Sequence, residues 1–260
     1  MELDITGKRI IVTGGARGMG AAIVKAYVSE GAHVVSLDVQ NDLGEEAVKE
    51  ANEIGPGKAT YYSCDISNPS EVESVFDTAI KEMGGLDVLA NIAGVIRTAP
   101  AEDIPNEDFD FIMNVNVRGT VLTNQLAFKA MRDNGSGAII NFGSISGLRQ
   151  EPGGAMYSAS KGAVMSWTRT VAAEWGPYGI RVNAVNPIIS TPMYEETRNN
   201  MTPEQRKAND EKVKQIIPLG GAYGDAERDL APVMIFLASD ASRFITSQLI
   251  PVDGGMSSVR

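Results

Sequence analysis

The sequence contains very little cysteine and histidine, and it has no long apolar run. Cys64 is the only cysteine among 260 residues, so neither an intrachain disulfide nor a thiolate metal cluster can form, and we expect no metal site. His33, the only histidine, precedes an apolar run and is predicted to be structural rather than a triad base. No apolar run approaches the about 18 residues that a membrane-spanning helix needs, and acids stand near the start, where a secretory peptide needs basic residues. We therefore expect a cytoplasmic protein.

Basic residues are also in the minority. Lysine and arginine number 23 against 33 acids, which gives a formal net charge of −10. Such a charge repels phosphate backbones and anionic lipids, so neither nucleic acid nor a membrane surface is an expected partner. Hydrophobic side chains make up 43% of the chain, which is enough for one sizeable core, and we expect residues 1–260 to form a single domain.

Short apolar runs rich in β-branched residues alternate with longer stretches of helical pattern. The runs lie at residues 9–13, 33–38, 60–65, 86–93, 138–144, 181–187 and 249–255. Nearly continuous apolar strands in a βαβ order indicate a parallel sheet that is buried on both faces. The predicted fold is therefore α/β, a doubly wound, Rossmann-like parallel sheet of about seven strands, with ligands bound beyond the carboxyl ends of the strands.

One segment interrupts this alternation. Residues 188–222 are polar and helical in pattern, and they follow a strand directly. A long excursion beside the carboxyl edge of a sheet favours a lid over the binding site, although a pair of solvated surface helices would give the same pattern.

A glycine-rich turn, "TGGARGMG" at residues 13–20, follows the first predicted strand and opens a helix. Gly14, Gly18 and Gly20 are spaced more widely than in the G-x-G-x-x-G fingerprint, but they serve the same purpose. They allow a tight turn and let backbone amides, with Arg17 and Met19 beside them, approach a pyrophosphate at the helix N-terminus. Taken alone, such a turn is weak evidence and favours a purely structural role.

Asp38 makes a dinucleotide site the better interpretation. It ends the second predicted strand, 18 residues beyond Gly20, where a carboxylate can accept hydrogen bonds from the adenosine ribose hydroxyls. A 2′-phosphate at that position would meet an uncompensated negative charge, so NAD is predicted rather than NADP. Arg17 argues the other way, because a guanidinium in the glycine turn can pair with that phosphate.

Polar residues also stand at two further strand ends. Asp65, followed by Ile66, ends the third predicted strand and could accept the adenine amino group. Asn91 follows the fourth and could hold backbone amides near the ribose. Each could instead be an ordinary cap or turn residue, but together they line successive strand ends at one edge of the sheet.

Tyr157 and Lys161 stand four residues apart in "GAMYSASKGAVMSW", a helical run of small residues. On a helix their side chains share one face, with Cβ atoms about 5–6 Å apart. An ammonium at that distance lowers a phenol pKa by roughly two units, from about 10 to about 8. The pair is therefore predicted to be an acid–base centre. A surface pair without chemistry is the alternative, but the small residues around it favour close packing.

Two more residues are candidates for this centre. Ser144 ends the predicted strand 138–144, thirteen residues before Tyr157, and its hydroxyl could hold a substrate oxygen beside the phenol. Asn116, in "NVNVRG", is a poor helix former inside a helical run and predicts a kink there.

Taken together, these motifs resemble the short-chain dehydrogenase/reductase family from end to end. "TGGARGMG", Asp38, "CDI", "NIAG", "NVNVRG", Ser144, "YSASK", "RVNAVNP" and "VDGG" stand in the order and spacing of that family. The resemblance implies a nicotinamide cofactor, a Ser144–Tyr157–Lys161 centre with Asn116 completing a proton relay, and a homo-oligomer, either a tetramer or a dimer. It also implies that Tyr157 and Lys161 contact the nicotinamide ribose.

The resemblance extends to further cofactor contacts but includes two departures. It places Ala93, Gly94, Pro187, Ile189 and Thr191 against the cofactor. "NIAG" replaces the usual N-N-A-G of the family, and "PIISTP" after the sixth predicted strand lacks the usual glycine and is one residue shorter. Without that glycine the loop must turn in another way if Ile189 and Thr191 are to reach the carboxamide.

The expected activity is that of an NAD-dependent secondary-alcohol dehydrogenase that also reduces ketones. The predicted substrate contacts are Ser144, Tyr157, Ile145, Ser146, Gln150 and Met193, with Ile96 and Ile189 as further lining residues. Most are apolar, which favours an uncharged hydrophobic or cyclic small molecule, although Arg97 and Arg149 lie nearby. An NADPH-dependent 3-oxoacyl-carrier-protein reductase and a non-catalytic dinucleotide-binding scaffold remain as alternatives.

Overall fold

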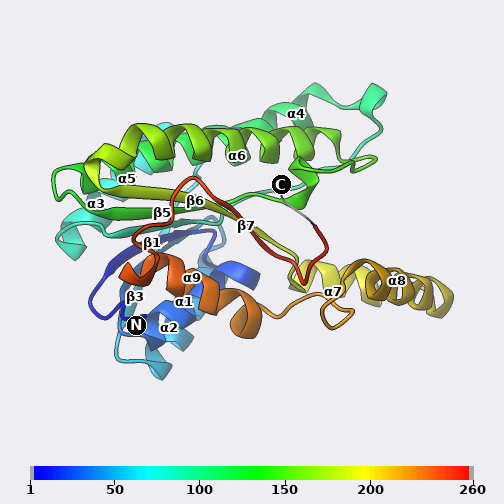
Figure 1. Cartoon of the computed structure of the whole chain (residues 1–260), viewed down its shortest axis with the longest axis horizontal. Coiled ribbons are helices and arrows are strands. Elements are labelled where there is room, and N and C mark those ends of the chain that lie inside the picture. The colour runs from blue at the N-terminus through cyan, green and yellow to red at the C-terminus, as the bar shows by residue number, and fades with distance from the viewer. Residues whose placement is uncertain (1–2, 258–260) are drawn as a thin grey trace.

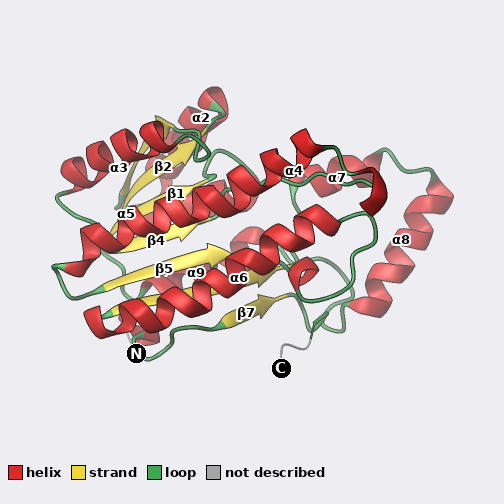
Figure 2. Cartoon of the chain, turned by 90° about the horizontal axis from the view of Figure 1, so that it is seen from above, coloured by secondary structure: helices red, strands yellow, loops and turns green. Residues whose placement is uncertain are grey.

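Seven parallel strands form one sheet in the order β3-β2-β1-β4-β5-β6-β7 in a computed structural model, which describes residues 3–257 but not the side chain of Met193. The strands are β1 (Arg9–Thr13), β2 (His33–Asp38), β3 (Lys58–Ser63), β4 (Val88–Asn91), β5 (Gly137–Phe142), β6 (Ile180–Pro187) and β7 (Leu249–Val252). The predicted doubly wound α/β sheet in a single domain is confirmed. The strand arrows in Figure 2 point toward the end of the molecule that holds α4 (Asn106–Ile112), α7 (Pro192–Asn199) and α8 (Pro203–Ile216).

Helices cover both faces of the sheet, as Figure 1 shows. One layer holds α1 (Gly18–Ser29), α2 (Asn41–Ile54) and α9 (Ala231–Ala238), and the other holds α3 (Pro69–Met83), α5 (Thr120–Arg132) and α6 (Ala155–Trp175). Alternate strand residues divide between two core clusters, so that Ile10 and Val12 pack on one face and Ile11 on the other. Because both faces are buried, the strands read as continuous apolar runs.

The predicted strands extend beyond the observed ones at the carboxyl edge. The pairing of β3 ends at Ser63, so Asp65 lies in the following turn, and β5 ends at Phe142, two residues before Ser144. The apolar pattern continues because the loops at this edge are themselves buried, as Cys64 and Ile145 are, each 2% exposed. Apolar residues therefore mark burial here and not strand pairing.

A π-helical stretch, η2 (Met113–Gly119), joins α4 to α5 and has Asn116 at its centre. The kink predicted at Asn116 is thus confirmed. A π-helical turn is a local widening that is commonly found at functional sites. The remaining short elements are η1 (Ala101–Asp103), η3 (Ile145–Gly147), η4 (Gly176–Tyr178), η5 (Ala226–Leu230) and η6 (Asp240–Ser242).

Residues 188–222 contain two helices that lie beyond the carboxyl ends of the strands. Thr191 and Thr202 cap α7 and α8 with their side chains, and a proline at the first helical position follows each cap. None of the helices in the described residues 3–257 has the length and apolar character needed to cross a bilayer.

Candidate active site

A cleft of about 660 Å³ opens at the carboxyl ends of β1, β2 and β4. The strand order reverses between β1 and β4, and ligands of open α/β sheets bind at such a switch point. The predicted residues that line the cleft are Gly14, Arg17, Gly18, Met19, Gly20, Asp38, Asp65, Ile66, Ala93, Gly94 and Thr191. The structure thus brings together predicted residues from five separate stretches of the chain.

The glycine turn needs glycine for two physical reasons. Gly14 and Gly18 have φ angles of 73° and 56°, which side chains disfavour. A Cβ at Gly14 would also lie 2.8 Å from the backbone of Ala93, so the turn and the 91–94 loop could not approach as they do. Arg17, at the N-cap position of α1, makes no side-chain capping bond to the described residues, and the first residues of α1 line the cleft, where an anion could accept from their amides.

The Asp38 carboxylate is held between this turn and the end of β2. One oxygen accepts the Ala16 amide at 3.1 Å, and the other accepts the Gln40 amide at 3.1 Å. Both bonds fix the carboxylate at the wall of the cleft, with its remaining lone pairs available to hydroxyl donors. A phosphate at the same place would face this negative charge.

Asp65 and Asn91 occupy different positions from those that the sequence predicts. Asp65 lies beyond its strand, and its Oδ1 accepts both the amide and the hydroxyl of Ser67, although the residue still lines the cleft. Asn91 is buried behind the cleft, where its Oδ1 accepts the Thr13 hydroxyl at 2.9 Å. The same hydroxyl accepts the amides of Ile92 and Ala93, so Asn91 supports the loop indirectly.

The shortened loop after Pro187 is extended. Ile189 pairs with Gly224 in a β-bridge, in which the Ser190 amide donates to the Gly224 carbonyl and the Gly224 amide donates to the Ile188 carbonyl. An extended segment has no need of the missing glycine, and it brings Thr191 to the cleft wall. Pro187 and the buried Ile189 are not among the described residues that line the cleft or the hollow beside Tyr157.

Ser144 and Tyr157 line a second, smaller hollow of about 230 Å³ next to the cleft. Ser144 caps η3, whereas Tyr157 lies in the first turn of α6. Lys161 lies one turn further on, with its Nζ 5.8 Å from the centre of the Tyr157 ring. This places the predicted tyrosine and lysine on one face of the helix.

Lys161 stands between the hollow and the nucleotide cleft. Its side chain is buried, and its Nζ donates to the Phe142 carbonyl at 2.8 Å. A Cβ at Gly94, which lines the cleft, would lie 3.3 Å from this Nζ. The ammonium can therefore reach both the phenol side and a group bound in the cleft.

The predicted lowering of the Tyr157 pKa is wrong in direction. Burial raises the pKa of Tyr157, a hydrogen bond with Ser144 lowers it, and the charge of Glu151 raises it. Burial also lowers the pKa of Lys161 to about 8. The sequence argument counted the attraction of the ammonium but left out the desolvation of both groups, which disfavours their charged forms.

Asn116 holds the loop beside Lys161. Its Oδ1 accepts the Val95 amide at 2.8 Å, and its Nδ2 donates to the Val95 carbonyl and to the Ser160 hydroxyl. Its own carbonyl accepts the Thr120 hydroxyl at 2.8 Å. The side chain thus fixes the 94–95 loop against α6, and the proton relay implied by the resemblance stays a prediction.

The structure brings some of the predicted substrate contacts to the hollow beside Tyr157, and their role in binding stays a prediction. Ile145, Ser146 and Ile96 line the hollow beside Tyr157, whereas Gln150 lines a neighbouring surface depression. Met193 lies in α7, and its side chain is outside the described part of the structure.

Sequence reasoning missed several lining residues of this hollow. They are Thr98, Glu151, Pro152, Gly154, Ile188, Tyr223 and Met256, which join Arg149. Tyr223 lies 66 residues beyond Tyr157 in the sequence, past α8, and no local pattern links the two. Glu151 could have been noticed, because it lies in the same short loop as Arg149.

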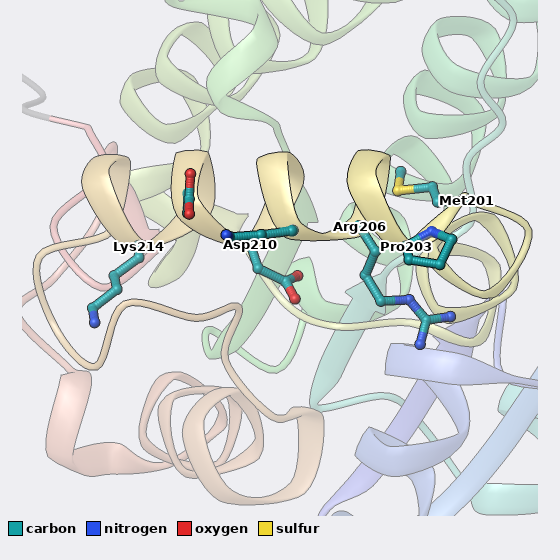
Figure 3. Close-up of a pocket in the computed structure, with 7 residues that line it drawn as sticks. Met201, Pro203, Arg206, Asp210 and Lys214 are labelled. Carbon is teal, nitrogen blue, oxygen red and sulfur yellow. The ribbon is translucent and has the colours of Figure 1, made fainter.

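Another hollow, of about 570 Å³, lies along α8 and holds none of the predicted site residues. Figure 3 shows Arg206, Asp210 and Lys214 extending from one side of this helix. They are spaced four residues apart, and Arg198 binds both oxygens of Asp210. Such a row is typical of a solvated helix face stabilised by charge pairs.

A doubly wound sheet with a glycine-turn cleft at its switch point and a serine, tyrosine and lysine beside it defines a dinucleotide-binding oxidoreductase. The comparisons agree. Residues 14–257 match the family model described as enoyl-(acyl carrier protein) reductase. The chain therefore belongs to the short-chain dehydrogenase/reductase family of oxidoreductases, which bind nicotinamide cofactors.

Two curated relatives have different activities. The chain is 36% identical to the 3-oxoacyl-acyl-carrier-protein reductase FabG of Thermotoga maritima, over 98% of this chain and 99% of that one. It is also 36% identical to the cyclopentanol dehydrogenase of Comamonas sp., over 96% and 97%.

Two solved structures superpose closely. Levodione reductase gives a TM-score of 0.89 at 33% identity, covering 96% of this chain and 97% of that one. NAD⁺-bound xylitol dehydrogenase gives a TM-score of 0.88 at 29% identity, covering 96% and 99%.

Proposed function

We propose that the protein is an NAD-dependent dehydrogenase of small uncharged secondary alcohols that also runs as a ketone reductase. The observation that carries this proposal is the position of Lys161. Its ammonium lies between the hollow that holds Ser144 and Tyr157 and the cleft formed by the glycine turn. The hollow thus presents the hydroxyl of Tyr157 as the acid–base group, and the cleft would hold the cofactor. The Lys161 ammonium lies close to both.

Tyr157, Ser144 and Lys161 each have a separate role in the proposed oxidation of the alcohol. Tyr157, as the phenolate, removes the hydroxyl proton of the substrate, and Ser144 holds the same oxygen and stabilises the charge that develops on it. Lys161 stabilises the phenolate and binds the ribose. The nicotinamide, when bound, accepts the hydride from the carbinol carbon. Burial raises the pKa of Tyr157 and the hydrogen bond with Ser144 lowers it, so Ser144 also favours the phenolate.

NAD is favoured over NADP by the Asp38 carboxylate. Two backbone amides fix it at the cleft wall, where a 2′-phosphate would be repelled. The close superposition with NAD⁺-bound xylitol dehydrogenase supports this assignment. Arg17 also lines the cleft and would favour the phosphate, but Asp38 lies nearer to the end of β2, where that group would bind.

A second candidate is an NADPH-dependent 3-oxoacyl-carrier-protein reductase, which the 36% identity to such an enzyme favours. Asp38 and the net charge of −10 oppose it, since the carrier protein is acidic. Comparing NADH with NADPH as electron donors separates the two. A strong preference for NADPH would favour the second candidate.

The central test is Tyr157→Phe. We expect the variant to bind NADH as the wild type does, because the ring remains, and to lose activity by about 10²- to 10⁴-fold, because the acid–base hydroxyl is gone. NADH fluorescence titration measures the first quantity, and absorbance of the reduced nicotinamide during oxidation of a panel of secondary alcohols measures the second. Unchanged turnover would remove Tyr157 from the mechanism, and a wild type that binds NADH but oxidises none of the alcohols would favour a non-catalytic scaffold.

A further inference from the structure

The hollow beside Tyr157 carries an ion pair that the proposed mechanism does not use. A guanidinium nitrogen of Arg149 lies 3.7 Å from an Oε of Glu151, and both side chains line the hollow with Ser144 and Tyr157. They are 42% and 41% exposed, so neither is sealed away from a ligand. Both come from the loop between η3 and α6, which the Ala99 amide ties to the 96–100 loop through the Gly153 carbonyl.

Tyr223 completes this part of the wall. The charges of Arg149 and Glu151 act on its phenol in opposite directions, Arg149 lowering and Glu151 raising its pKa. The phenol is therefore within electrostatic reach of both. Thr98 and Ser146 contribute further hydroxyl groups. This wall is thus more polar than the apolar residues predicted from the sequence indicate.

The distance between Arg149 and Glu151 determines whether the two groups can bind a ligand. At 3.7 Å the nitrogen and oxygen are farther apart than the about 2.7–3.2 Å of a direct hydrogen bond, so the pair leaves both a donor and an acceptor free to bind a third group. A hydroxyl is suited to this arrangement, because it can donate to the carboxylate while it accepts from the guanidinium. A carboxylate on the ligand would be attracted by Arg149 but repelled by Glu151.

The size of the hollow limits the ligand. Its volume is about 230 Å³, below the about 300–1,000 Å³ of sites for drug-sized ligands. At about 30 Å³ for each water-sized group, that volume holds about eight such groups. A molecule with two oxygens on a short or six-membered carbon skeleton fits this limit.

We propose that Arg149 and Glu151 form a subsite for a second hydroxyl group, so that the preferred substrates are compact uncharged diols. This inference rests on the proposed function, since it concerns the same site. Oxidation breaks the C–H and O–H bonds of one carbinol and forms its C=O double bond, with the hydride passing to NAD and the hydroxyl proton to the Tyr157 phenolate. The products are a hydroxyketone and NADH. The second hydroxyl stays intact and orients the molecule so that the reacting carbinol faces Ser144 and Tyr157.

The test compares matched substrates that differ by one hydroxyl. Values of kcat/KM with NAD are measured for cis-1,2-cyclohexanediol, cyclohexanol and 3-hydroxybutanoate, which bears a carboxylate. For the wild type we expect the diol to exceed cyclohexanol by at least about tenfold, because a site built to bind a hydroxyl discriminates against an analogue that lacks it. We expect 3-hydroxybutanoate to be the poorest of the three.

Two variants address the subsite directly. In Glu151→Gln and in Arg149→Met, the ratio of kcat/KM for the diol to kcat/KM for cyclohexanol should fall to about threefold or less. Lys8→Met and Asp240→Asn alter another exposed ion pair, with an N···O distance of 3.0 Å, at the opposite edge of the sheet, and both should keep the wild-type ratio. Thermal melting with NADH present verifies that each variant is folded.

The outcomes separate the two proposals. The subsite is refuted if kcat/KM for cyclohexanol or for 3-hydroxybutanoate equals that for the diol. It is also refuted if Glu151→Gln and Arg149→Met leave the ratio of kcat/KM for the diol to that for cyclohexanol unchanged. In either case the dehydrogenase assignment stands. If the wild type oxidises none of the three, nor any other secondary alcohol, with NAD or NADP, both proposals fail together.

Discussion

At the scale of single residues, the charge balance around Tyr157 is expected to set the pH dependence of the proposed reaction. Burial and Glu151 raise the pKa of the phenol, and Ser144 lowers it. In the proposed mechanism, oxidation needs the Tyr157 phenolate and reduction needs the protonated phenol. The pH profile of each direction therefore reports the same group.

Glu151→Gln is expected to lower the pKa of Tyr157, because it removes a negative charge that disfavours the phenolate. The rising limb of kcat/KM for oxidation should then move to lower pH, and the falling limb for reduction should move with it. Ser144→Ala should move both limbs to higher pH, since it removes the hydrogen bond that lowers the pKa. Shifts in the same direction for the two variants would contradict this charge balance.

Asp38→Ser is expected to shift the cofactor preference toward NADP, because it removes the charge that a 2′-phosphate would meet. The ratio of kcat/KM for NAD to that for NADP should fall by at least about tenfold. Asp65→Ser is the matched control, as it removes a carboxylate from the part of the cleft predicted to hold the adenine common to both cofactors. If Asp38→Ser leaves the ratio as it is in the wild type, Asp38 does not select the cofactor.

Residue-scale prediction from the sequence works where chemistry depends on local spacing. Tyr157 and Lys161 are four residues apart on one helix face, and Gly14 and Gly20 are six residues apart around one turn. A short stretch of sequence therefore determines each of these arrangements. The sequence could not reveal how deeply these groups are buried, and the predicted pKa of Tyr157 was wrong for that reason. Tyr223 was missed because only the folded chain brings it to the hollow.

At the scale of elements, α7 and α8 are held together by side chains, which is consistent with a lid that acts as one piece. Arg198 of α7 binds both oxygens of Asp210 in α8, and the Asn209 amide donates to the Tyr194 hydroxyl. The Tyr194 ring also meets the Tyr223 ring edge-on, with centroids 4.3 Å apart. This contact joins the helices to the wall of the substrate hollow.

Tyr194→Ala is therefore expected to raise the KM for the alcohol by about three- to tenfold, because an aromatic contact of about 0.5–1.5 kcal/mol that positions Tyr223 is lost. The KM for NAD should change less, since Tyr194 lies on the substrate side. Steady-state kinetics with each substrate varied in turn measures both. Tyr178→Ala is the control, because this exposed tyrosine contacts Phe128 far from the hollow. An equal effect of the two substitutions would argue against the lid.

Element boundaries were predicted less well than element types. All seven strands lie where the apolar runs indicate, but β3 ends two residues before the run does, and so does β5. The cause is that the site-bearing loops are packed as tightly as the strands, so hydrophobicity does not distinguish paired backbone from buried loop. Polarity was the sole guide to the two helices within 188–222.

At the scale of the whole molecule, a buried polar network ties both halves of the sheet together. Asn91 contacts Thr13, Thr120 and Thr123, and the amide of Asn141, on the neighbouring strand, exchanges hydrogen bonds with that of Asn124. These contacts join β1, β4, β5 and α5 beneath the cofactor cleft. The network thus connects the strands and the helix that lie beneath the cleft.

Asn91→Ala should lower the free energy of unfolding by about 1–3 kcal/mol, because it removes the buried oxygen to which the Thr13 hydroxyl donates and the hydrogen bonds of Asn91 with Thr120 and Thr123. Urea denaturation measures the loss. Asn134→Ala, at an exposed position, should change stability by less than about 0.5 kcal/mol. A loss as small for Asn91→Ala would mean that the network adds little to stability.

The bridge between Ile189 and Gly224 joins the two ends of the segment that carries α7 and α8. Thr191 lies two residues after Ile189 and lines the cleft formed by the glycine turn. Tyr223 directly precedes Gly224 and lines the hollow beside Tyr157. If residues 188–222 form the predicted lid, this bridge would make the segment move as one unit, so that opening it for one ligand would also weaken the contacts to the other. Release of the product and release of the cofactor would then be expected to occur together.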